Sequence, residues 1–243
     1  MPLHILLNGA QGRMGQAIAA VAPDRNAEIT GAVDLGDDPA SQVANCDVII
    51  DFSLREATRG IVELAAENGK PVVIGTTGHS PEEKEGIASL SSEIPMVWAG
   101  NYSTGVNLLF YLTRIAAEVL GEDFDCEVVE AHHRHKQDAP SGTAERLLEV
   151  LREARGLDPD SIVHGRSGIT GERPKDQIGS HALRGGDVVG DHMAWFAGEG
   201  EKLELTHRAT DRKIFAVGAL RAAHWLVEQP SGLYSMQDVL GLK

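Results

Sequence analysis

The sequence predicts an α/β fold, with a parallel sheet covered on both faces in the first half and a mixed α+β second half. Three observations predict it. Short apolar runs rich in β-branched residues alternate with helical stretches over residues 3–99. A glycine-rich turn follows the first run directly. From residue 178 onward, glycine turns separate short alternating stretches, which is typical of antiparallel strands. Two domains are therefore expected.

Length and composition indicate a folded, acidic protein. The 243 residues suffice for one large or two small domains, and 42% of them are hydrophobic against 24% charged. This balance allows a sizeable core and excludes an intrinsically disordered chain. The formal net charge of −14 repels nucleic acid and anionic membranes, so neither is expected as a general partner. A small anionic ligand stays open if the chain concentrates positive charge locally.

The cysteine content and the first residues predict a cytoplasmic location. Cys46 and Cys126 form no CxxC pair, so neither a disulfide framework nor a thiolate zinc site is expected. Residues 1–5 lack the basic segment and long apolar stretch of a signal peptide. No run of about 18 apolar residues occurs, so no membrane-spanning helix is expected.

The elements of the first half follow from apolar runs and helix-start signals. Ser80, Pro81 and two acidic residues have the order of an N-cap, a first helical position and a first turn. The apolar positions of residues 54–68 recur on one stripe, as in an amphipathic helix. The expected strands are 3–7, 28–33, 48–52, 72–74 and 96–99, and the expected helices are 13–21, 54–68 and the one beginning at Pro81.

The second half is expected to combine longer helices with hairpins. Residues 127–129 form a short strand that leads into a histidine-rich segment, and glycine turns separate the later strands. The expected helices are 105–120, the one capped by Ser141, and 214–227; the expected antiparallel strands are 181–184, 193–196 and 203–206, joined by hairpins.

A loop of three regularly spaced glycines follows the first expected strand, with the sequence Gly9-Ala10-Gln11-Gly12-Arg13-Met14-Gly15. Glycines at these positions permit a tight turn, a close approach of the backbone to a pyrophosphate, and close packing of the helix on its strand. The helix then offers unpaired N–H groups and the positive end of its dipole to phosphates. The loop predicts a dinucleotide-binding site, and an ordinary tight turn is the alternative.

Asp34 supports the dinucleotide interpretation and predicts which dinucleotide is preferred. It ends the second expected strand, 19 residues after Gly15, where a carboxylate can accept hydrogen bonds from the adenosine ribose. Leu35 follows it, whereas a 2′-phosphate would require an arginine there and would be repelled by the aspartate. We therefore expect NADH to be preferred over NADPH, which stays open as a second cofactor.

The most distinctive segment joins a basic cluster to the start of a helix. Residues 130–136 read Glu-Ala-His-His-Arg-His-Lys, and residues 137–144 read Gln-Asp-Ala-Pro-Ser-Gly-Thr-Ala. Five consecutive side chains that can be cationic repel one another unless anions or carboxylates neutralise them. Ser141 can cap the following helix, and Gly142 allows a ligand to approach its N-terminal N–H groups. Cations and N–H donors together predict a site for a small carboxylate or phosphate with a proton donor beside it.

Other interpretations of His132, His133 and His135 stay open at this stage. The three histidines could bind a metal ion, although no thiolate or HExxH-like spacing accompanies them. They could equally form a solvated basic surface loop. A nucleic-acid-binding patch would need more lysine and arginine in a less acidic chain.

Residues 130–144 resemble the signature of the dihydrodipicolinate reductase family over 15 consecutive positions. Such a match is far more specific than a glycine loop. Further segments that resemble the family are Gly9–Gly15, Gly75-Thr76-Thr77-Gly78, Ala99-Gly100-Asn101-Tyr102, Ile178-Gly179, Arg184-Gly185, and Gly190 with His192. The resemblance therefore covers essentially the whole chain.

The resemblance implies an activity, an architecture and an assembly. The activity is NAD(P)H-dependent reduction of 4-hydroxy-tetrahydrodipicolinate, a cyclic imine with two carboxylates, to tetrahydrodipicolinate with loss of water, in lysine and diaminopimelate biosynthesis. Residues 1–103 and 213–243 would form a Rossmann-like cofactor domain. Residues 104–212 would form the domain that binds the substrate and builds a homotetramer.

The resemblance also implies site residues by position. His132 resembles the catalytic acid/base and Lys136 the proton donor, while His133, Gly142 and Thr143 resemble the group that holds the substrate carboxylates. No metal is implied. The residues that resemble the cofactor site are Gly9, Ala10, Gln11, Gly12, Arg13, Met14, Asp34, Gly75, Thr76, Thr77, Ala99, Gly100, Asn101 and Tyr102.

Three departures from the family and three other functions complete the expectations. Leu35 stands where many relatives have arginine, which argues against NADPH, and Tyr102 and His79 each stand where phenylalanine is common. We expect the latter two to modulate cofactor packing without abolishing it.

The alternative functions are reduction of a related cyclic imine, another NAD-dependent reaction of amino-acid metabolism such as aspartate dehydrogenation, and non-catalytic dinucleotide sensing.

Overall fold

A computed structural model describes residues 1–242. Their contacts divide the chain into two compact units, one of Met1–Thr104 with the segment from Arg212 onward, and one of Gly105–Asp211. Residues from both ends of the chain therefore fold together in the first unit. None of the helices in the described chain combines the length and apolar character that crossing a bilayer requires.

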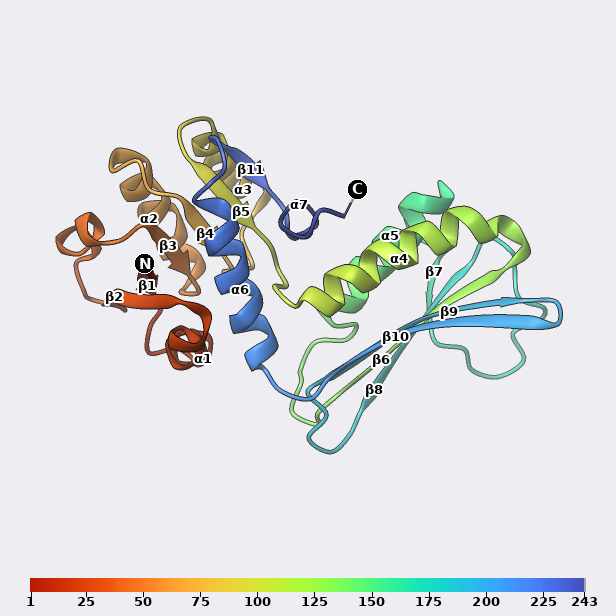
Figure 1. Cartoon of the computed structure of the whole chain (residues 1–243). Coiled ribbons are helices and arrows are strands. Elements are labelled where there is room, and N and C mark those ends of the chain that lie inside the picture. Colours follow the sequence, from red (N-terminus) through yellow and green to blue (C-terminus); the bar gives the residue numbers. More distant parts are fainter. Residues whose placement is uncertain (243) are drawn as a thin grey trace. The chain divides into compact units, whose positions relative to one another are not determined.

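The first unit is built on a parallel sheet (Figure 1). In the described chain its strands lie in the order β11-β5-β4-β3-β1-β2, and all of the pairings are parallel. Parallel strands buried on both faces read as continuous apolar runs, which is why the sequence shows them clearly. Their bounds are β1 Leu3–Asn8, β2 Ala27–Val33, β3 Val48–Asp51, β4 Val72–Ile74, β5 Pro95–Trp98 and β11 Gly232–Tyr234.

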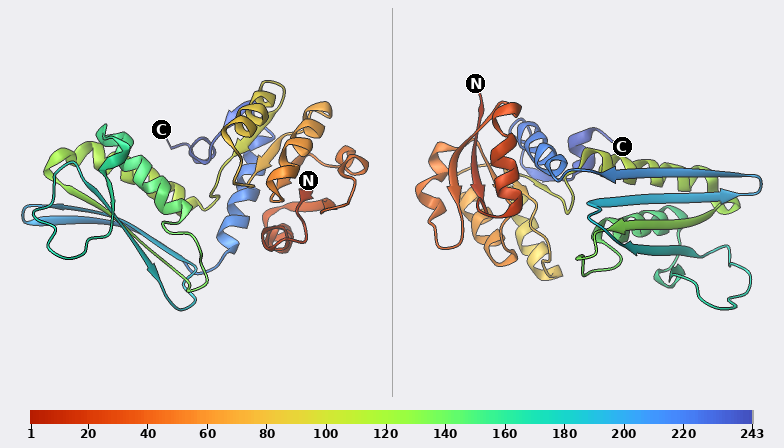
Figure 2. Two further views of the ribbon diagram at one scale, coloured as in Figure 1. Left: turned by 180° about the vertical axis from the view of Figure 1, so that it is seen from behind. Right: turned by 90° about the horizontal axis from the view of Figure 1, so that it is seen from below.

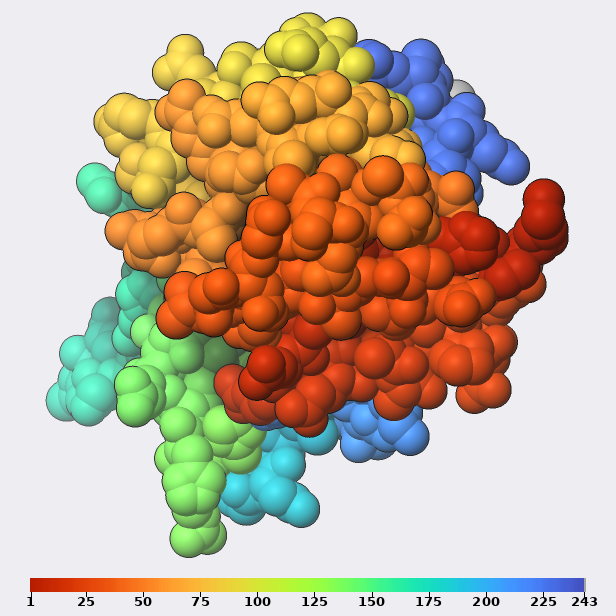
Figure 3. All heavy atoms as spheres, turned by 90° about the vertical axis from the view of Figure 1, so that its left-hand side faces the viewer, coloured from red at the N-terminus to blue at the C-terminus, as the bar shows by residue number. Residues whose placement is uncertain are grey.

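Helices cover both faces of this sheet. On one face α1 (Arg13–Val21) packs against α6 (Lys213–Leu226), and their apolar residues share a core with β1 and β3. On the other face α2 (Arg55–Glu67) and α3 (Pro81–Ser89) enclose a second core. Figure 3 shows a face of this unit formed by the N-terminal part of the chain, coloured red to yellow.

The expected strands and helices of the first half are confirmed with small changes at their ends. The helix-start signal at Ser80 is a complete capping box, in which the Ser80 hydroxyl accepts from the Glu83 N–H at 3.2 Å and the Glu83 carboxylate accepts from the Ser80 N–H at 2.6 Å. Strand β11 and helix α7 (Met236–Leu240) were not predicted. Strand β11 has none of the β-branched residues that mark the equally short β4, and the five residues of α7 are too few to show a helical period.

The second unit holds a mixed sheet with helices on one face (Figure 2). Its strand order, within the described residues, is β10-β9-β6-β8-β7. Helices α4 (Thr104–Leu120) and α5 (Gly142–Arg155) enclose a core with the inward side chains of the sheet. The strands are β6 Asp125–His132, β7 Ile162–His164, β8 Ile178–Arg184, β9 Gly190–Gly198 and β10 Glu201–Ala209.

One expected hairpin is wrong. The hairpin between β9 and β10 is confirmed, but β8 and β9 do not pair. Strand β6 lies between them, parallel to β8 and antiparallel to β9. Strand β6 buries side chains on both of its faces, as a strand in the middle of a sheet does. A central strand pairs along both edges, so β6 takes β8 and β9 as its two neighbours. It is also longer than the expected 127–129, and it ends at His132.

Candidate functional site

The expected site residues fall into two groups, one on each unit. In the first unit, the carboxyl ends of β1, β3, β4 and β5 lie at one edge of the sheet, where ligands bind in open α/β sheets. The loops at this edge contain the expected cofactor residues. Gly9, Ala10, Gln11 and Gly12 follow β1, Arg13 and Met14 begin α1, Asp34 follows β2, Gly75, Thr76 and Thr77 follow β4, and Ala99, Gly100, Asn101 and Tyr102 follow β5.

The glycine loop is packed so closely that side chains would not fit at two of its glycines. Gly9 has a φ of +80°, and a Cβ there would collide with the carbonyl of Phe52. A Cβ at Gly15 would collide with the carbonyl oxygens of Gly9 and Ala10. Gly12 is the N-cap of α1 and makes no side-chain cap, so the cap residue itself does not occupy the first N–H groups of this helix. This is the geometry that a phosphate requires.

Asp34 is attached to the glycine loop through the backbone. Its carboxylate accepts hydrogen bonds of 2.8 Å each from the N–H groups of Leu35 and Gln11. These two N–H donors, that of Leu35 first, lower the pKa of Asp34 below its ordinary value. The carboxylate is therefore ionised at neutral pH, and the Leu35 side chain beside it is 87% exposed.

Asp51, a residue that the sequence reasoning missed, links the loops of the cofactor edge. It ends β3, is fully buried, and accepts hydrogen bonds from the side chains of Asn8 (2.7 Å), Ser53 (2.5 Å), Thr58 (2.9 Å) and Thr76 (2.8 Å). A buried carboxylate is stable only when its lone pairs are satisfied in this way. Asp51 thereby holds the strand end before Gly9 and the turn at Thr76 together.

The turns after β4 and after β5 border a cavity of about 580 Å³. Thr76, Thr77, Ala99 and Gly100 are among its lining residues. His79 also lines it; the imidazole is buried and packs edge-on against Trp98, with ring centroids 5.1 Å apart. The cavity therefore places these two expected turns next to one open space within the first unit.

The side chain of Tyr102 belongs to the core of this unit. It is 1% exposed, and its hydroxyl donates to the carbonyls of Ile74 (2.7 Å) and Val97 (3.2 Å) at the ends of β4 and β5. Its ring packs against Phe52. The hydroxyl that replaces a hydrogen of phenylalanine thus joins two strand ends, and burial strongly raises its pKa.

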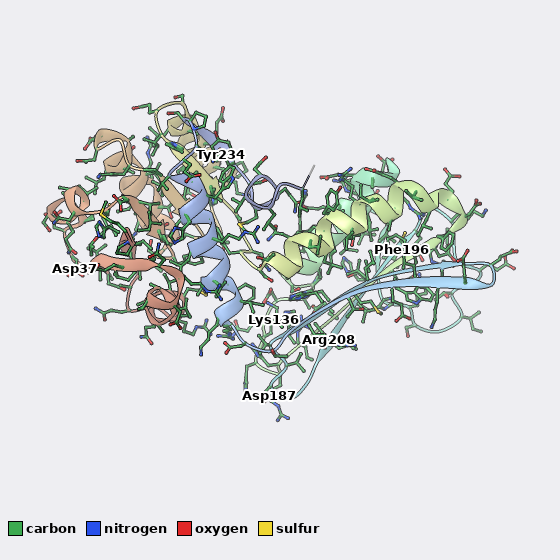
Figure 4. All side chains as sticks on the ribbon, in the orientation of Figure 1. Asp37, Lys136, Asp187, Phe196, Arg208 and Tyr234 are labelled. Carbon is green, nitrogen blue, oxygen red and sulfur yellow. The ribbon has the colours of Figure 1, made fainter. Side chains whose placement is uncertain are left out.

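In the second unit the histidine-rich segment begins on a strand and continues into a loop. His132 ends β6 with its side chain buried, while Lys136 lies in the following loop and donates a 2.8 Å hydrogen bond to Asp138. The His133 N–H donates to the Val188 carbonyl at 2.8 Å, which fastens this loop to the one before β9. Figure 4 labels Lys136, Asp187 and Arg208 at this end of the sheet.

A buried carboxylate organises the segment. Glu130 is 1% exposed, and its Oε2 lies 2.5 Å from Nδ1 of His132. Arg184 of β8 donates to both of its oxygens, at 2.8 and 2.7 Å. Burial raises the pKa of Glu130, but the hydrogen bonds from Arg184 and His132 outweigh it and lower the pKa overall. The carboxylate therefore stays ionised beside the histidine.

The helix start at Ser141 lies against the same group. The Ser141 hydroxyl accepts from the Ala144 N–H at 3.2 Å, which confirms it as the N-cap of α5, and it lies 3.0 Å from Nε2 of His192. Burial, followed by the nearby His132, lowers the pKa of His192 to about 4, so this imidazole is neutral at neutral pH. Gly142 and Thr143 form the first turn of α5, directly after this cap.

A second buried carboxylate lies three residues earlier on the same strand. Glu127 is bound by Arg166 at 2.7 and 3.1 Å, by Arg173 at 3.0 Å and by His181 at 2.7 Å. Burial raises its pKa, but these partners outweigh burial and bring the pKa to about 2. This cluster fastens the segment between β7 and β8 to β6.

The structure thus joins His132, Lys136 and the start of α5 at one end of the second sheet. Over residues 1–242, no three His, Cys, Asp or Glu side chains are grouped to hold a metal ion. The sequence reasoning used Glu130 only as part of a motif and assigned no role to Asp51. A signal was available for both, since each is a carboxylate inside an apolar strand run, where an unpaired charge is not tolerated.

Comparison with known proteins gives the same family over the whole chain. The family model described as "Dihydrodipicolinate reductase, N-terminus" matches residues 3–102, and the one described as "Dihydrodipicolinate reductase, C-terminus" matches residues 105–240. The 4-hydroxy-tetrahydrodipicolinate reductase of Akkermansia muciniphila is 52% identical, covering 99% of this chain and 98% of that protein. The protein of the same name from Anaeromyxobacter sp. strain Fw109-5 is 49% identical, with the same coverage.

A solved structure shares the fold. Dihydrodipicolinate reductase from Paenisporosarcina sp. TG-14, determined with dipicolinate bound, superposes with a TM-score of 0.79 at 23% identity, over 98% of this chain and 99% of that one. The two-part architecture is therefore that of an existing reductase structure. The two family models and the relatives, which cover nearly every residue, establish that the chain belongs to the dihydrodipicolinate reductase family.

Proposed function

We propose that this chain reduces 4-hydroxy-tetrahydrodipicolinate to tetrahydrodipicolinate with a nicotinamide dinucleotide. The observation that carries the proposal is the full-length match to relatives named for this reaction. The contacts of residues 130–144 support it, because they gather a histidine, a lysine and a helix N-terminus at one end of a sheet. These are the groups that a doubly anionic cyclic imine requires.

The two units have different roles in this proposal. Residues 1–103 and 213–243 hold the cofactor, with its pyrophosphate on the N-terminus of α1 and its adenosine ribose on Asp34. Residues 104–212 hold the substrate. When bound, the nicotinamide supplies the hydride that reduces C4 of the substrate.

The residues of the second unit manage charge and protons. Loss of the 4-hydroxyl group as water leaves a conjugated imine, and its reduction leaves an enamine that takes up one proton. We assign His132 as the acid/base and Lys136 as the proton donor, because an imidazole both accepts and donates a proton and an ammonium group both pairs with a carboxylate and donates a proton. His133, Gly142 and Thr143 hold the substrate carboxylates.

We propose NADH as the preferred cofactor. The ionised Asp34 accepts ribose hydroxyls and repels a 2′-phosphate, and the exposed Leu35 offers no cation to a phosphate. NADPH then binds more weakly because its extra phosphate meets a negative charge.

We further propose a cytoplasmic homotetramer built through the second unit. On the sheet face that points away from α4 and α5, Val129, Met193 and Trp195 are only half-buried and Leu183 is 56% exposed. Apolar side chains on a sheet face are an interaction surface in soluble proteins. Both cysteines are free and buried, which suits a reducing compartment. Light scattering should give a mass near four times the 26.0 kDa of one chain.

A coupled assay tests the proposed reaction. The substrate is generated in situ from pyruvate and aspartate semialdehyde by the preceding synthase, and oxidation of NADH and NADPH is followed at 340 nm. Oxidation that depends on the synthase supports the reductase. Folded protein that binds NADH but oxidises neither cofactor would favour the related-imine or sensor alternative.

A further inference from the structure

Glu130 is the most completely bonded carboxylate near the histidine-rich segment. It belongs to β6, two residues before His132, so both side chains point to the same face of the strand. It accepts two hydrogen bonds from Arg184, one from the Ser141 N–H at 3.2 Å, and lies 2.5 Å from Nδ1 of His132. Three elements, β6, β8 and the start of α5, thus meet at one side chain.

These contacts determine which nitrogen of His132 carries the proton. An ionised carboxylate only accepts hydrogen bonds, so the Nδ1 atom facing Glu130 must be the donor. The neutral ring then has its lone pair on Nε2, and the imidazolium has its transferable proton there. A Cβ on Gly190 would lie 3.0 Å from this Nε2, so the missing side chain leaves space beside the atom.

We propose that Glu130 is a positioning residue that, held by Arg184, fixes the tautomer and orientation of His132 and so presents Nε2 to the substrate. The inference rests on the proposed function and adds a residue to it. Glu130 does not itself reach the reacting atoms, because its oxygens are occupied by Arg184, Ser141 and His132. Asp138 belongs to the same arrangement, since Arg184 also donates to its carbonyl at 2.7 Å.

The remaining charged groups around His132 are consistent with this role. The His192 ring packs edge-on against His132, with centroids 5.0 Å apart, and is neutral at neutral pH. Within residues 1–242, the anion that contacts the His132 ring is Glu130. The titratable or charged groups that face this cluster from the neighbouring elements are Arg184 of β8, His192 of β9, His207 of β10 and Lys136 of the loop after β6.

The variant Glu130→Gln keeps the size of the side chain but removes its charge. We expect kcat to fall by roughly 10²–10⁴-fold, the range of a general acid or base that is lost or misoriented. The kcat–pH profile should change, because the His132 ring loses its anionic partner. The Kd for NADH should not change. KM should rise by a smaller factor than the factor by which kcat falls.

Glu127→Gln is the matched control, because it removes a buried carboxylate of the same strand with two arginine partners and one histidine partner. It should cost stability while leaving kcat within about threefold and the pH profile in place. A His132→Ala/Glu130→Gln double variant should be no slower than His132→Ala alone, since Glu130 acts through His132.

A measurement on the unaltered enzyme keeps the inference testable if Glu130→Gln does not fold. Nitrogen-15 chemical shifts of His132 should show the proton of the neutral ring on Nδ1. A proton on Nε2, or a Glu130→Gln enzyme with normal kcat and an unmoved pH profile, would overturn the role of Glu130. Failure of the proposed function looks different, because the unaltered enzyme would then not oxidise NADH or NADPH in the coupled assay.

Discussion

The backbone N–H of Gln11 donates a 2.8 Å hydrogen bond to the carboxylate of Asp34, which ties the loop after β1 to the end of β2. The pKa of Asp34 is lowered by the N–H groups of Leu35 and Gln11, and its negative charge persists at neutral pH. The contact that joins the loop to β2 therefore also keeps charged the carboxylate on which the proposed preference for NADH depends.

Leu35→Arg should shift the cofactor preference toward NADPH. The new guanidinium can pair with a 2′-phosphate, and a hydrogen bond to a charged group contributes about 1.5–3 kcal/mol, or roughly tenfold or more in kcat/KM. The measurement is kcat/KM with both cofactors. Val119→Arg, a charge added at an exposed position of α4, should leave the ratio unchanged. Equal efficiency with NADH and NADPH in the unaltered enzyme would contradict the argument from Asp34.

His132→Ala and Lys136→Ala should each lower kcat by roughly 10²–10⁴-fold if the two side chains move protons. NADH affinity, measured by fluorescence titration, should be unaffected because both residues belong to the second unit. His164→Ala, at an exposed position of β7, is the matched control and should retain normal turnover. Near-normal turnover of both test variants would show that the proposed roles are wrong.

Gly15→Ala should weaken NADH binding and destabilise the protein. The added Cβ would collide with the carbonyls of Gly9 and Ala10, and such overpacking costs about 1–3 kcal/mol. Gly60→Ala in α2 is the control, because the added Cβ meets nothing within 4 Å beyond its own stretch of helix backbone, and alanine is more stable than glycine in a helix interior by about 0.5–1 kcal/mol. Urea unfolding and NADH titration of both variants measure the effect. Normal affinity in Gly15→Ala would count against the close packing of the loop.

Glu127 should make the free energy of unfolding fall in acid. Its pKa is about 2 in the folded protein against an ordinary value of 4.5, so its contribution is complete above pH 4.5 and is lost as the pH falls toward 2. Glu127→Gln should be less stable at pH 7 and should show a flatter pH dependence between pH 5 and 3. Urea unfolding at several pH values tests this. Glu118→Gln, which removes a half-exposed ion pair on α4, should behave like the unaltered protein.

The sequence by itself determined the elements of the parallel sheet and the segment that carries the family resemblance. Buried parallel strands are continuous apolar runs. The N-caps Ser80 and Ser141 are directly followed in the sequence by the helices that they cap. These signals are local, so a window of a few residues is enough to detect them.

Only the tertiary structure decided which strands pair and which distant donors bind the buried carboxylates. β6 separates β8 from β9, although β8 and β9 are neighbours in the sequence. Glu130 meets Arg184 across 54 residues of sequence, and Asp51 meets Asn8 across 43. Strand order depends on which edges remain free once the core has formed, and a buried charge is stable only where distant donors converge on it. Neither condition can be detected in a short stretch of sequence.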